Sequence, residues 1–251
     1  MLEEFSLIGK AALVTGAGSP MGRAIVQALT EAGASVAAVS MDVSTIASTI
    51  DEISGSGRKI VAFSADVTEE IQVQTVVNRT MEAFGRIDIL VNGEDADFGK
   101  PILETNLEEW RKVFDINVTS IFLCCKAVAP IMIEQGKGKI VNISSALSQR
   151  AVVNGAVYCA SKGAISQLTQ ALALEWGPNQ ISINAVAPGW FADGPVDPLE
   201  DLKENRVRMI PQYRRGQPED IAGLVVYLAS EAGSYTTGQN ILVDGGLHTH
   251  A

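Results

Sequence analysis

A tyrosine and a lysine four positions apart carry the clearest chemical signal in the sequence. Tyr158 and Lys162 lie near the start of a helix expected over Ala156–Trp176. Residues at i and i+4 share one helical face, so the phenol and the ammonium can point into one site. A phenol titrates near pH ~10, and a nearby cation favours the phenolate and brings the pKa toward the range useful for proton transfer. The pair therefore predicts a general acid/base.

Two serines stand at the end of a strand expected over Lys139–Ser144. Ser144 and Ser145 would lie at the carboxyl edge of the sheet, where doubly wound sheets bind ligands. A hydroxyl there can hydrogen-bond the oxygen of a carbonyl or an alcohol. A Tyr-x-x-x-Lys motif alone arises often by chance, whereas a strand-end serine followed thirteen residues later by that motif is specific.

A glycine loop would supply a nucleotide site. Thr15–Gly22 reads TGAGSPMG, follows a strand expected at Lys10–Thr15 and opens a helix expected at Met21–Ala32. Glycines let the backbone approach a pyrophosphate, and the helix N-terminus supplies N–H donors and positive potential. Pro20 has no N–H but suits the first helical position, so neighbours such as Met21 must supply the donors. A glycine-rich turn that only packs is the alternative.

The elements that position these residues alternate along the chain. Further strands are expected at Ser35–Ser40, Lys59–Phe63, Ile87–Val91, Ile181–Ala187 and Asn240–Val243, and further helices at Thr45–Ile53, Glu69–Phe84, Leu107–Gln135 and Pro218–Ala229. The alternation predicts an α/β fold, a Rossmann-like doubly wound parallel sheet of about seven strands with helices on both faces. We expect one domain over residues 1–251, in which the proline-rich, charged stretch 189–217 is a substrate-binding insertion.

Taken together, the motifs resemble the classical short-chain dehydrogenase/reductase family from Leu7 to Gly246. The resemblance rests on TGAGSPMG at 15–22, Asp66-Val67, Asn117, Ser145, Tyr158, Lys162, NAVAPG at 184–189 and VDGG at 243–246. It implies an oxidoreductase that moves a hydride between a nicotinamide cofactor and a small-molecule carbonyl or secondary alcohol. Tyr158 would then be the general acid/base, and Lys162 would lower its pKa and hold the nicotinamide ribose. Ser145 would polarise the substrate oxygen, and Asn117 would hold a water that links Lys162 to solvent.

The resemblance also implies the residues around the cofactor and the substrate. The expected cofactor-binding residues are Gly16, Ser19, Met21, Gly22, Ser40, Met41, Asp66, Val67, Asn92, Tyr158, Lys162, Pro188 and Gly189. Among them, Asp66 would accept a hydrogen bond from the adenine amino group. Ser145, Trp190 and Phe191 would contact the substrate. No metal site is expected, because no acidic or thiol ligand pattern surrounds His248 and His250.

Three departures from the family pattern fall on the cofactor side. Pro20 replaces a glycine, Asn92-Gly-Glu-Asp95 replaces Asn-Asn-Ala-Gly, and Asp193 replaces the threonine that binds the carboxamide. Glu94 and Asp95 bring bulk and negative charge near a pyrophosphate. The departures keep open a second hypothesis, a non-catalytic nucleotide-binding protein of the same fold. The four intact catalytic positions favour the enzyme.

The substrate class stays open at this point. A 3-oxoacyl thioester reductase is one alternative within the enzyme class, although acyl carriers are usually acidic and so is this chain. A basic cluster could attract an anionic substrate such as a carboxylate or a coenzyme A phosphate, or could form a solvated face. Its members are Lys203, Arg206, Arg208, Arg214 and Arg215.

Cofactor choice depends on the end of the second strand. In dinucleotide folds an acid there selects NAD, and a nearby arginine selects the 2′-phosphate of NADP. Ser40 takes the place of the acid and Met41 that of the arginine. Loss of the acid favours NADP, whereas Asp42 could swing back and favour NAD. Arg23, one turn into the first helix, is expected to face away.

Composition narrows the remaining possibilities. The chain has 251 residues, of which 47% are hydrophobic and 19% charged, which excludes a disordered protein. Its net charge of −10 argues against nucleic-acid binding. Three cysteines without a disulfide pattern indicate a reducing cytoplasm, and no uninterrupted apolar run reaches the ~18 residues of a membrane span. The family resemblance implies a homotetramer.

Overall fold

Seven parallel strands form one sheet in the order β3-β2-β1-β4-β5-β6-β7. The computed structural model describes residues 2–47, 50, 59–194, 196–197, 201–204 and 206–249. The strands are β1 Ala11–Val14, β2 Ser35–Ser40, β3 Ile60–Ser64, β4 Ile89–Asn92, β5 Gly138–Ile143, β6 Ile181–Pro188 and β7 Asn240–Val243. The predicted α/β fold with a doubly wound parallel sheet is confirmed.

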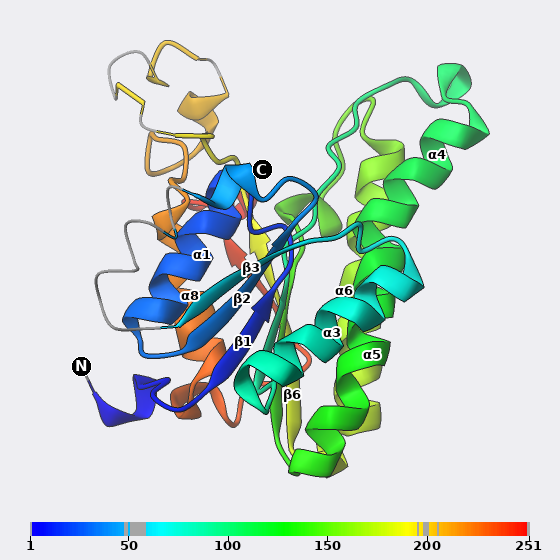
Figure 1. The fold of residues 1–251 in the computed structure, drawn as a ribbon. Coiled ribbons are helices and arrows are strands. Elements are labelled where there is room, and N and C mark those ends of the chain that lie inside the picture. The colour runs from blue at the N-terminus through cyan, green and yellow to red at the C-terminus, as the bar shows by residue number, and fades with distance from the viewer. Residues whose placement is uncertain are drawn as a thin grey trace.

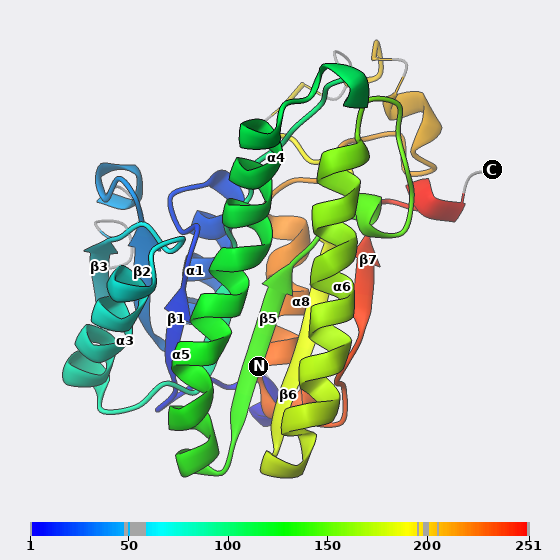
Figure 2. The same cartoon turned by 90° about the vertical axis from the view of Figure 1, so that its right-hand side faces the viewer.

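Two layers of helices cover the sheet (Figures 1 and 2). One layer holds α1 Pro20–Glu31 and α8 Glu219–Ala229, and the other holds α3 Glu70–Phe84, α4 Leu107–Phe114, α5 Ser120–Gln135 and α6 Ala156–Trp176. Short helical turns, η1 Glu3–Phe5, η2 Ile102–Glu104, η4 Ala146–Ser148, η5 Gly177–Asn179, η6 Val207–Met209, η7 Glu231–Gly233 and η8 Leu247–Thr249, join them.

The apolar strand sequences follow from burial on both faces. Every residue of β1, β4, β5 and β6 is buried. Side chains alternate between the two layers, as the period of a strand requires: Leu13 and Leu90 pack with α3, α5 and α6, whereas Val14 and Val91 pack with α1 and α8. The core therefore has two halves separated by the sheet.

The strand order reverses between β1 and β4. The chain winds outward from β1 to β3, returns to β4 beside β1, and continues to β7. A crevice forms outside the carboxyl ends of the strands at such a switch point, and ligands bind there. The glycine loop 15–22 follows β1 and the segment 93–96 follows β4, so both border this crevice.

The helix expected over Leu107–Gln135 is interrupted. A π-helical turn, η3 Asp115–Thr119, separates α4 from α5, and Asn117 lies inside it. By length and composition alone the whole stretch could cross a membrane, but 50% of its most apolar window is buried in the fold. It packs against α3, α6, β4 and β5, as expected of a core helix.

Two expected features fall partly on residues outside the described ranges. The helix predicted at Thr45–Ile53 includes residues 48, 49 and 51–53, and the stretch 189–217 includes 195, 198–200 and 205; His250 is also outside. Within 189–217, Phe191 bridges to Gly216, and buried Asp201 pairs with Arg215 at 2.5 Å. These contacts fold the ends of the stretch together.

Candidate active site

Tyr158 and Lys162 lie on one face of α6, near its first turn, as their spacing predicts. Tyr158 is 8% exposed and Lys162 is fully buried. The Lys162 Nζ atom lies 5.5 Å from the centroid of the Tyr158 ring and 3.4 Å from the carbonyl oxygen of Ile143. A buried ammonium is costly unless a negative group compensates it.

Asp95 supplies that negative group. Its carboxylate forms an ion pair with Lys162 Nζ at 3.0 Å and accepts a hydrogen bond from the Tyr158 hydroxyl at 3.1 Å. Burial raises the pKa of Tyr158 above its ordinary value, the Asp95 charge raises it further, and a hydrogen bond with Ser145 acts in the opposite direction. The expectation that Lys162 lowers this pKa stays a prediction, because in this structure the lysine charge is directed at Asp95.

Ser145 lies beside the phenol at the carboxyl end of β5. Its hydroxyl accepts a hydrogen bond from the Leu147 amide at 3.1 Å and caps the turn η4, while it also contacts Tyr158. Ser144 points elsewhere and donates to the Lys162 carbonyl at 3.4 Å. Of the two serines, Ser145 is therefore the one that can reach a substrate oxygen held at Tyr158.

Asn117 fixes the segment after β4 to the catalytic helix. Its amide donates to Ser161 Oγ at 3.0 Å and to the Ala96 carbonyl at 3.2 Å, and its carbonyl oxygen accepts from the Ala96 amide at 2.7 Å. Both amide hydrogens are thus used by protein acceptors. In this structure the Asn117 side chain holds the Ala96 backbone next to Asp95, and its expected role of holding a water stays a prediction.

The glycine loop is a tight backbone cradle at the N-terminus of α1. A Cβ on Gly16 would lie 2.2 Å from the Gly93 carbonyl oxygen, and one on Gly22 would lie 2.1 Å from that of Gly16. Ser19 caps the helix by accepting from the Gly22 amide at 3.0 Å, and Pro20 occupies the first helical position. The loop fits a pyrophosphate, since backbone amides and a helix N-terminus meet there.

A carboxylate already contacts this cradle. Glu94 accepts a hydrogen bond from the Gly16 amide at 2.8 Å through Oε1. Burial raises the pKa of Glu94, and the charges of Asp66 and Asp95 act in the same direction. The sequence predicts both acids near the pyrophosphate. The structure instead divides them, Glu94 at the glycine loop and Asp95 at the Tyr158–Lys162 pair.

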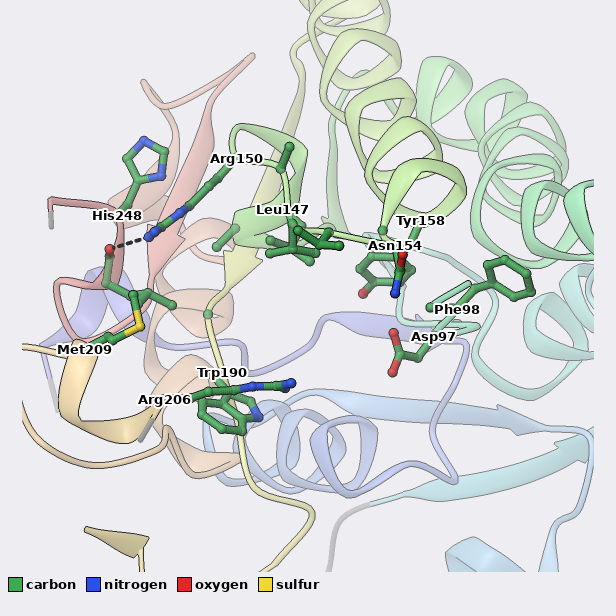
Figure 3. Close-up of a pocket in the computed structure, with 18 residues that line it drawn as sticks. Asp97, Phe98, Leu147, Arg150, Asn154, Tyr158, Trp190, Arg206, Met209 and His248 are labelled. Atoms are coloured by element: carbon green, nitrogen blue, oxygen red, sulfur yellow. Dashed lines mark hydrogen bonds between the residues drawn. The ribbon is translucent and has the colours of Figure 1, made fainter. Parts of the chain in front are cut away.

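A cavity of about 710 Å³ opens in front of Tyr158 (Figure 3). Figure 3 shows Asp97, Phe98 and Asn154 beside Tyr158, and Trp190 with Arg206 across from them. The lining also includes Leu147, Arg150, Met209 and His248. The Arg206 guanidinium lies 5.4 Å from the Trp190 ring, and Arg150 donates to the Leu247 carbonyl at 2.9 Å.

Comparisons with known proteins agree with this geometry. Residues 16–248 match the family described as Enoyl-(Acyl carrier protein) reductase. The chain is 36% identical over 98% of each chain to the 2-dehydro-3-deoxy-D-gluconate 5-dehydrogenase of Pseudoalteromonas atlantica, and 37% identical over 96% of this chain and 98% of the relative to a 3-oxoacyl-[acyl-carrier-protein] reductase of Synechocystis. A gluconate 5-dehydrogenase from Burkholderia cenocepacia J2315, solved with NADP and tartrate, superposes with a TM-score of 0.90 at 31% identity, over 100% of this chain and 99% of that one.

The chain belongs to the short-chain dehydrogenase/reductase family. It is an oxidoreductase that acts on carbonyl and hydroxyl groups with NAD(P), as the sequence predicts. The alternative of a non-catalytic nucleotide-binding protein is not favoured. The structure brings together the four residues expected to be catalytic, Asn117, Ser145, Tyr158 and Lys162, with Asn117 and Lys162 fully buried.

The remaining expected cofactor positions border the same edge of the sheet. Ser40 ends β2 with its hydroxyl 3.3 Å from Thr45 Oγ1, and Met41 is 71% exposed. The Asp66 carboxylate accepts from the Thr68 amide and hydroxyl, next to buried Val67. Asn92 ends β4 and donates to Asn142 at 2.8 Å. Pro188 ends β6, and a Cβ on the next residue, Gly189, would lie 2.6 Å from Asp244. Met21 lies in the first turn of α1.

Two residues differ from their expected placement, and a third lines the cavity unexpectedly. Arg23 does not face away from the loop, because its guanidinium donates to the Gly18 carbonyl at 2.5 Å. Phe191 packs against Gly216 and the α1/α8 half of the core and does not line the cavity with Trp190. Arg150 lines the cavity without having been expected there. The sequence spacing between Arg150 and Tyr158 does not predict this placement, because the turn after η4 is what directs Arg150 to the cavity.

Proposed function

We propose that the chain interconverts a small keto acid and the corresponding hydroxy acid, with Tyr158 as the proton donor and acceptor. The observation that carries the proposal is the cavity, in which Tyr158 lies together with Arg150 and Arg206. Guanidinium groups recognise carboxylates by charge-assisted hydrogen bonds. Two relatives with sugar-acid names, and tartrate in one solved structure, support the same substrate class.

The roles of the side chains follow from their positions. The nicotinamide, when bound, supplies or takes the hydride. The Tyr158 phenol, whose pKa burial raises further, donates its proton to the carbonyl oxygen during reduction. Ser145 hydrogen-bonds the same oxygen. The Lys162 ammonium, which pairs with Asp95, supplies a positive charge beside the phenol. Asn117 holds the segment after β4 in place.

Within the basic cluster, two arginines form ion pairs, whereas a third lines the cavity, where it can bind an anionic substrate. Arg214 pairs with Asp220, and Arg215 pairs with Asp201. Arg206 lines the cavity. Since Trp190 and Arg206 both belong to the stretch 189–217, we propose that this stretch forms one wall of the substrate site within a single-domain chain.

A substrate panel tests the proposal. NADPH oxidation would be followed with sugar-derived keto acids, the matching neutral ketoses and a 3-oxoacyl thioester. Arg206→Gln should raise KM for the keto acids about tenfold or more, because it removes a charge-assisted hydrogen bond that contributes about 1.5–3 kcal/mol. The KM for the neutral ketoses should stay unchanged. Arg208→Gln, outside the cavity lining, is the matched control. A thioester turned over faster than every keto acid would replace this substrate class with the acyl one.

NADP is the proposed cofactor rather than NAD. Gly18 has two hydroxyls and a guanidinium around it. A Cβ on Gly18 would lie 2.6 Å from Ser40 Oγ and 2.2 Å from Thr45 Oγ1. The Arg23 guanidinium donates to the Gly18 carbonyl. Two hydroxyls and a guanidinium suit a 2′-phosphate. The Asp42 carboxylate accepts from the Ser44 amide instead of turning back. We expect kcat/KM to favour NADPH over NADH, and Arg23→Gln to erase the preference.

We also propose a cytoplasmic homotetramer. The three cysteines are free, which suits a reducing compartment. Burial raises the pKa of the Cys125 thiol to about 12, so this thiol is unreactive at neutral pH. Exposed apolar side chains on α5 and α6 support association of subunits through these helices.

A further inference from the structure

Two consecutive carboxylates after β4 reach both parts of the crevice. Glu94 accepts from the Gly16 amide of the glycine loop at 2.8 Å. Asp95 lies 3.0 Å from Lys162 Nζ and 3.1 Å from the Tyr158 hydroxyl. One short segment of the chain therefore holds a donor of the expected phosphate site and both groups of the catalytic pair.

The segment is anchored on both sides. The Gly93 amide donates to Thr15 Oγ1 at 3.2 Å, beside the glycine loop. The Ala96 amide and carbonyl are both held by fully buried Asn117. Between these anchors Glu94 is half-buried and the Asp95 side chain is 45% exposed. The backbone is thus fixed, while the two side chains can turn toward solvent.

The charges favour this arrangement in the free protein and oppose it when a dinucleotide binds. Lys162 has no solvent contact, so Asp95 compensates its charge. A carboxylate on the Gly16 amide satisfies a donor at the positive end of α1. A dinucleotide brings two phosphates to the glycine loop, where like charges in a partly buried site repel Glu94 strongly, and its nicotinamide ribose would take the contact with Lys162 that Asp95 makes in the free protein.

We propose that Glu94 and Asp95 form an internal acidic ligand of the dinucleotide crevice, which the cofactor must displace, so that this pair sets the affinity for the cofactor. The proposal rests on the cofactor-binding roles of Gly16 and Lys162 given above. It gives a role to Glu94 and Asp95, which stand in the loop after β4 where the family pattern has small residues.

Cofactor binding without substrate tests the proposal directly. The fluorescence of NADPH would be titrated with the wild type, the isosteric Glu94→Gln/Asp95→Asn variant and the smaller Glu94→Ala/Asp95→Gly variant. We expect the Kd for NADPH to fall severalfold in the isosteric variant and at least tenfold in the smaller one. Glu3→Gln/Glu4→Gln, exposed residues of η1, makes the same change in net charge and should leave the Kd unchanged.

A second measurement separates affinity from folding. Without cofactor, Glu94→Ala/Asp95→Gly should melt below the wild type, because Lys162 loses its counter-charge, and NADPH should raise its Tm by more than that of the wild type. Equal or weaker NADPH binding by folded variants would overturn the inference and leave the proposed function standing. Failure of the wild type and all variants to bind NADPH would overturn the cofactor site itself.

Discussion

Single side chains decide how this site differs from the pattern its sequence resembles. Tyr158, Lys162 and Ser145 were predicted from residue type and spacing, because a helical turn and a strand end fix where such side chains point. The contact of Asp95 with Tyr158 was not predictable, since the two residues are 63 positions apart and only the packed loop brings them together.

Tyr158→Phe should separate chemistry from binding. Phenylalanine keeps the buried ring but has no proton to transfer, so we expect kcat to fall by ~10²–10⁴-fold while NADPH binding stays nearly unchanged. Steady-state kinetics and NADPH titration would measure the two effects. Tyr235→Phe, fully exposed, is the control and should behave as wild type. A rate above about a tenth of wild type would remove Tyr158 from the proton step.

Asp95→Asn should change the pH dependence of the reaction. Burial is the larger cause of the raised pKa of Tyr158, and the Asp95 charge adds to it. Removing that charge lowers the phenol pKa, so the phenolate needed for alcohol oxidation forms at lower pH. The rise with pH of kcat/KM for NADP in the oxidation direction, which reports groups of the cofactor-free protein, should therefore shift to lower pH in the variant. A profile that keeps its position would show that Asp95 does not act on the phenol before the cofactor binds.

The bounds of helices and strands are predicted well where their buried faces give the sequence a regular apolar pattern. Ser35–Ser40, Ala156–Trp176 and Asn240–Val243 have the expected bounds. The break in the expected helix Leu107–Gln135 was not predicted, because the π-helical turn at Asn117 is accompanied by contacts with Ala96 and Ser161 that local sequence does not contain. Tertiary contacts override propensity at such positions.

Two helical glycines offer a matched test of the glycine loop. A Cβ on Gly22 in α1 would lie 2.1 Å from a backbone oxygen, whereas one on Gly223 in α8 has no atom within 4 Å. Gly22→Ala should lower the free energy of unfolding by about 1–3 kcal/mol through overpacking and weaken NADPH binding. Gly223→Ala should raise it by about 0.5–1 kcal/mol. Urea denaturation of both variants would check this. Equal stability of the two would argue against a close-packed loop.

At the scale of the whole molecule, the outer surface of the α5/α6 layer bears on assembly. Phe122 and Ile133 on α5 are 47% and 41% exposed, and Leu174 on α6 is 83% exposed. Exposed apolar side chains on two neighbouring helices suit a subunit contact.

Light scattering should accordingly give the mass of a tetramer at micromolar concentration. Phe122→Glu should shift the mass to smaller species, because it introduces a charge into a contact that excludes water. Ile71→Glu on α3, which is 83% exposed, is the control and should keep the wild-type mass. A monomeric wild type would contradict the proposed assembly.

The hydrogen bond from Gly16 to Glu94 joins positions 78 residues apart, and this separation orders the events of folding. The first three strands connect locally and can pair as soon as they are made, whereas the crevice needs β4 beside β1 and Asn117 to hold the intervening segment. Contacts of such long range form late, since the chain must first lose the entropy of closing the loop. We therefore expect a nascent chain that ends before β4 to have its glycine loop but no crevice, and NADPH to give no stability to this first half during synthesis.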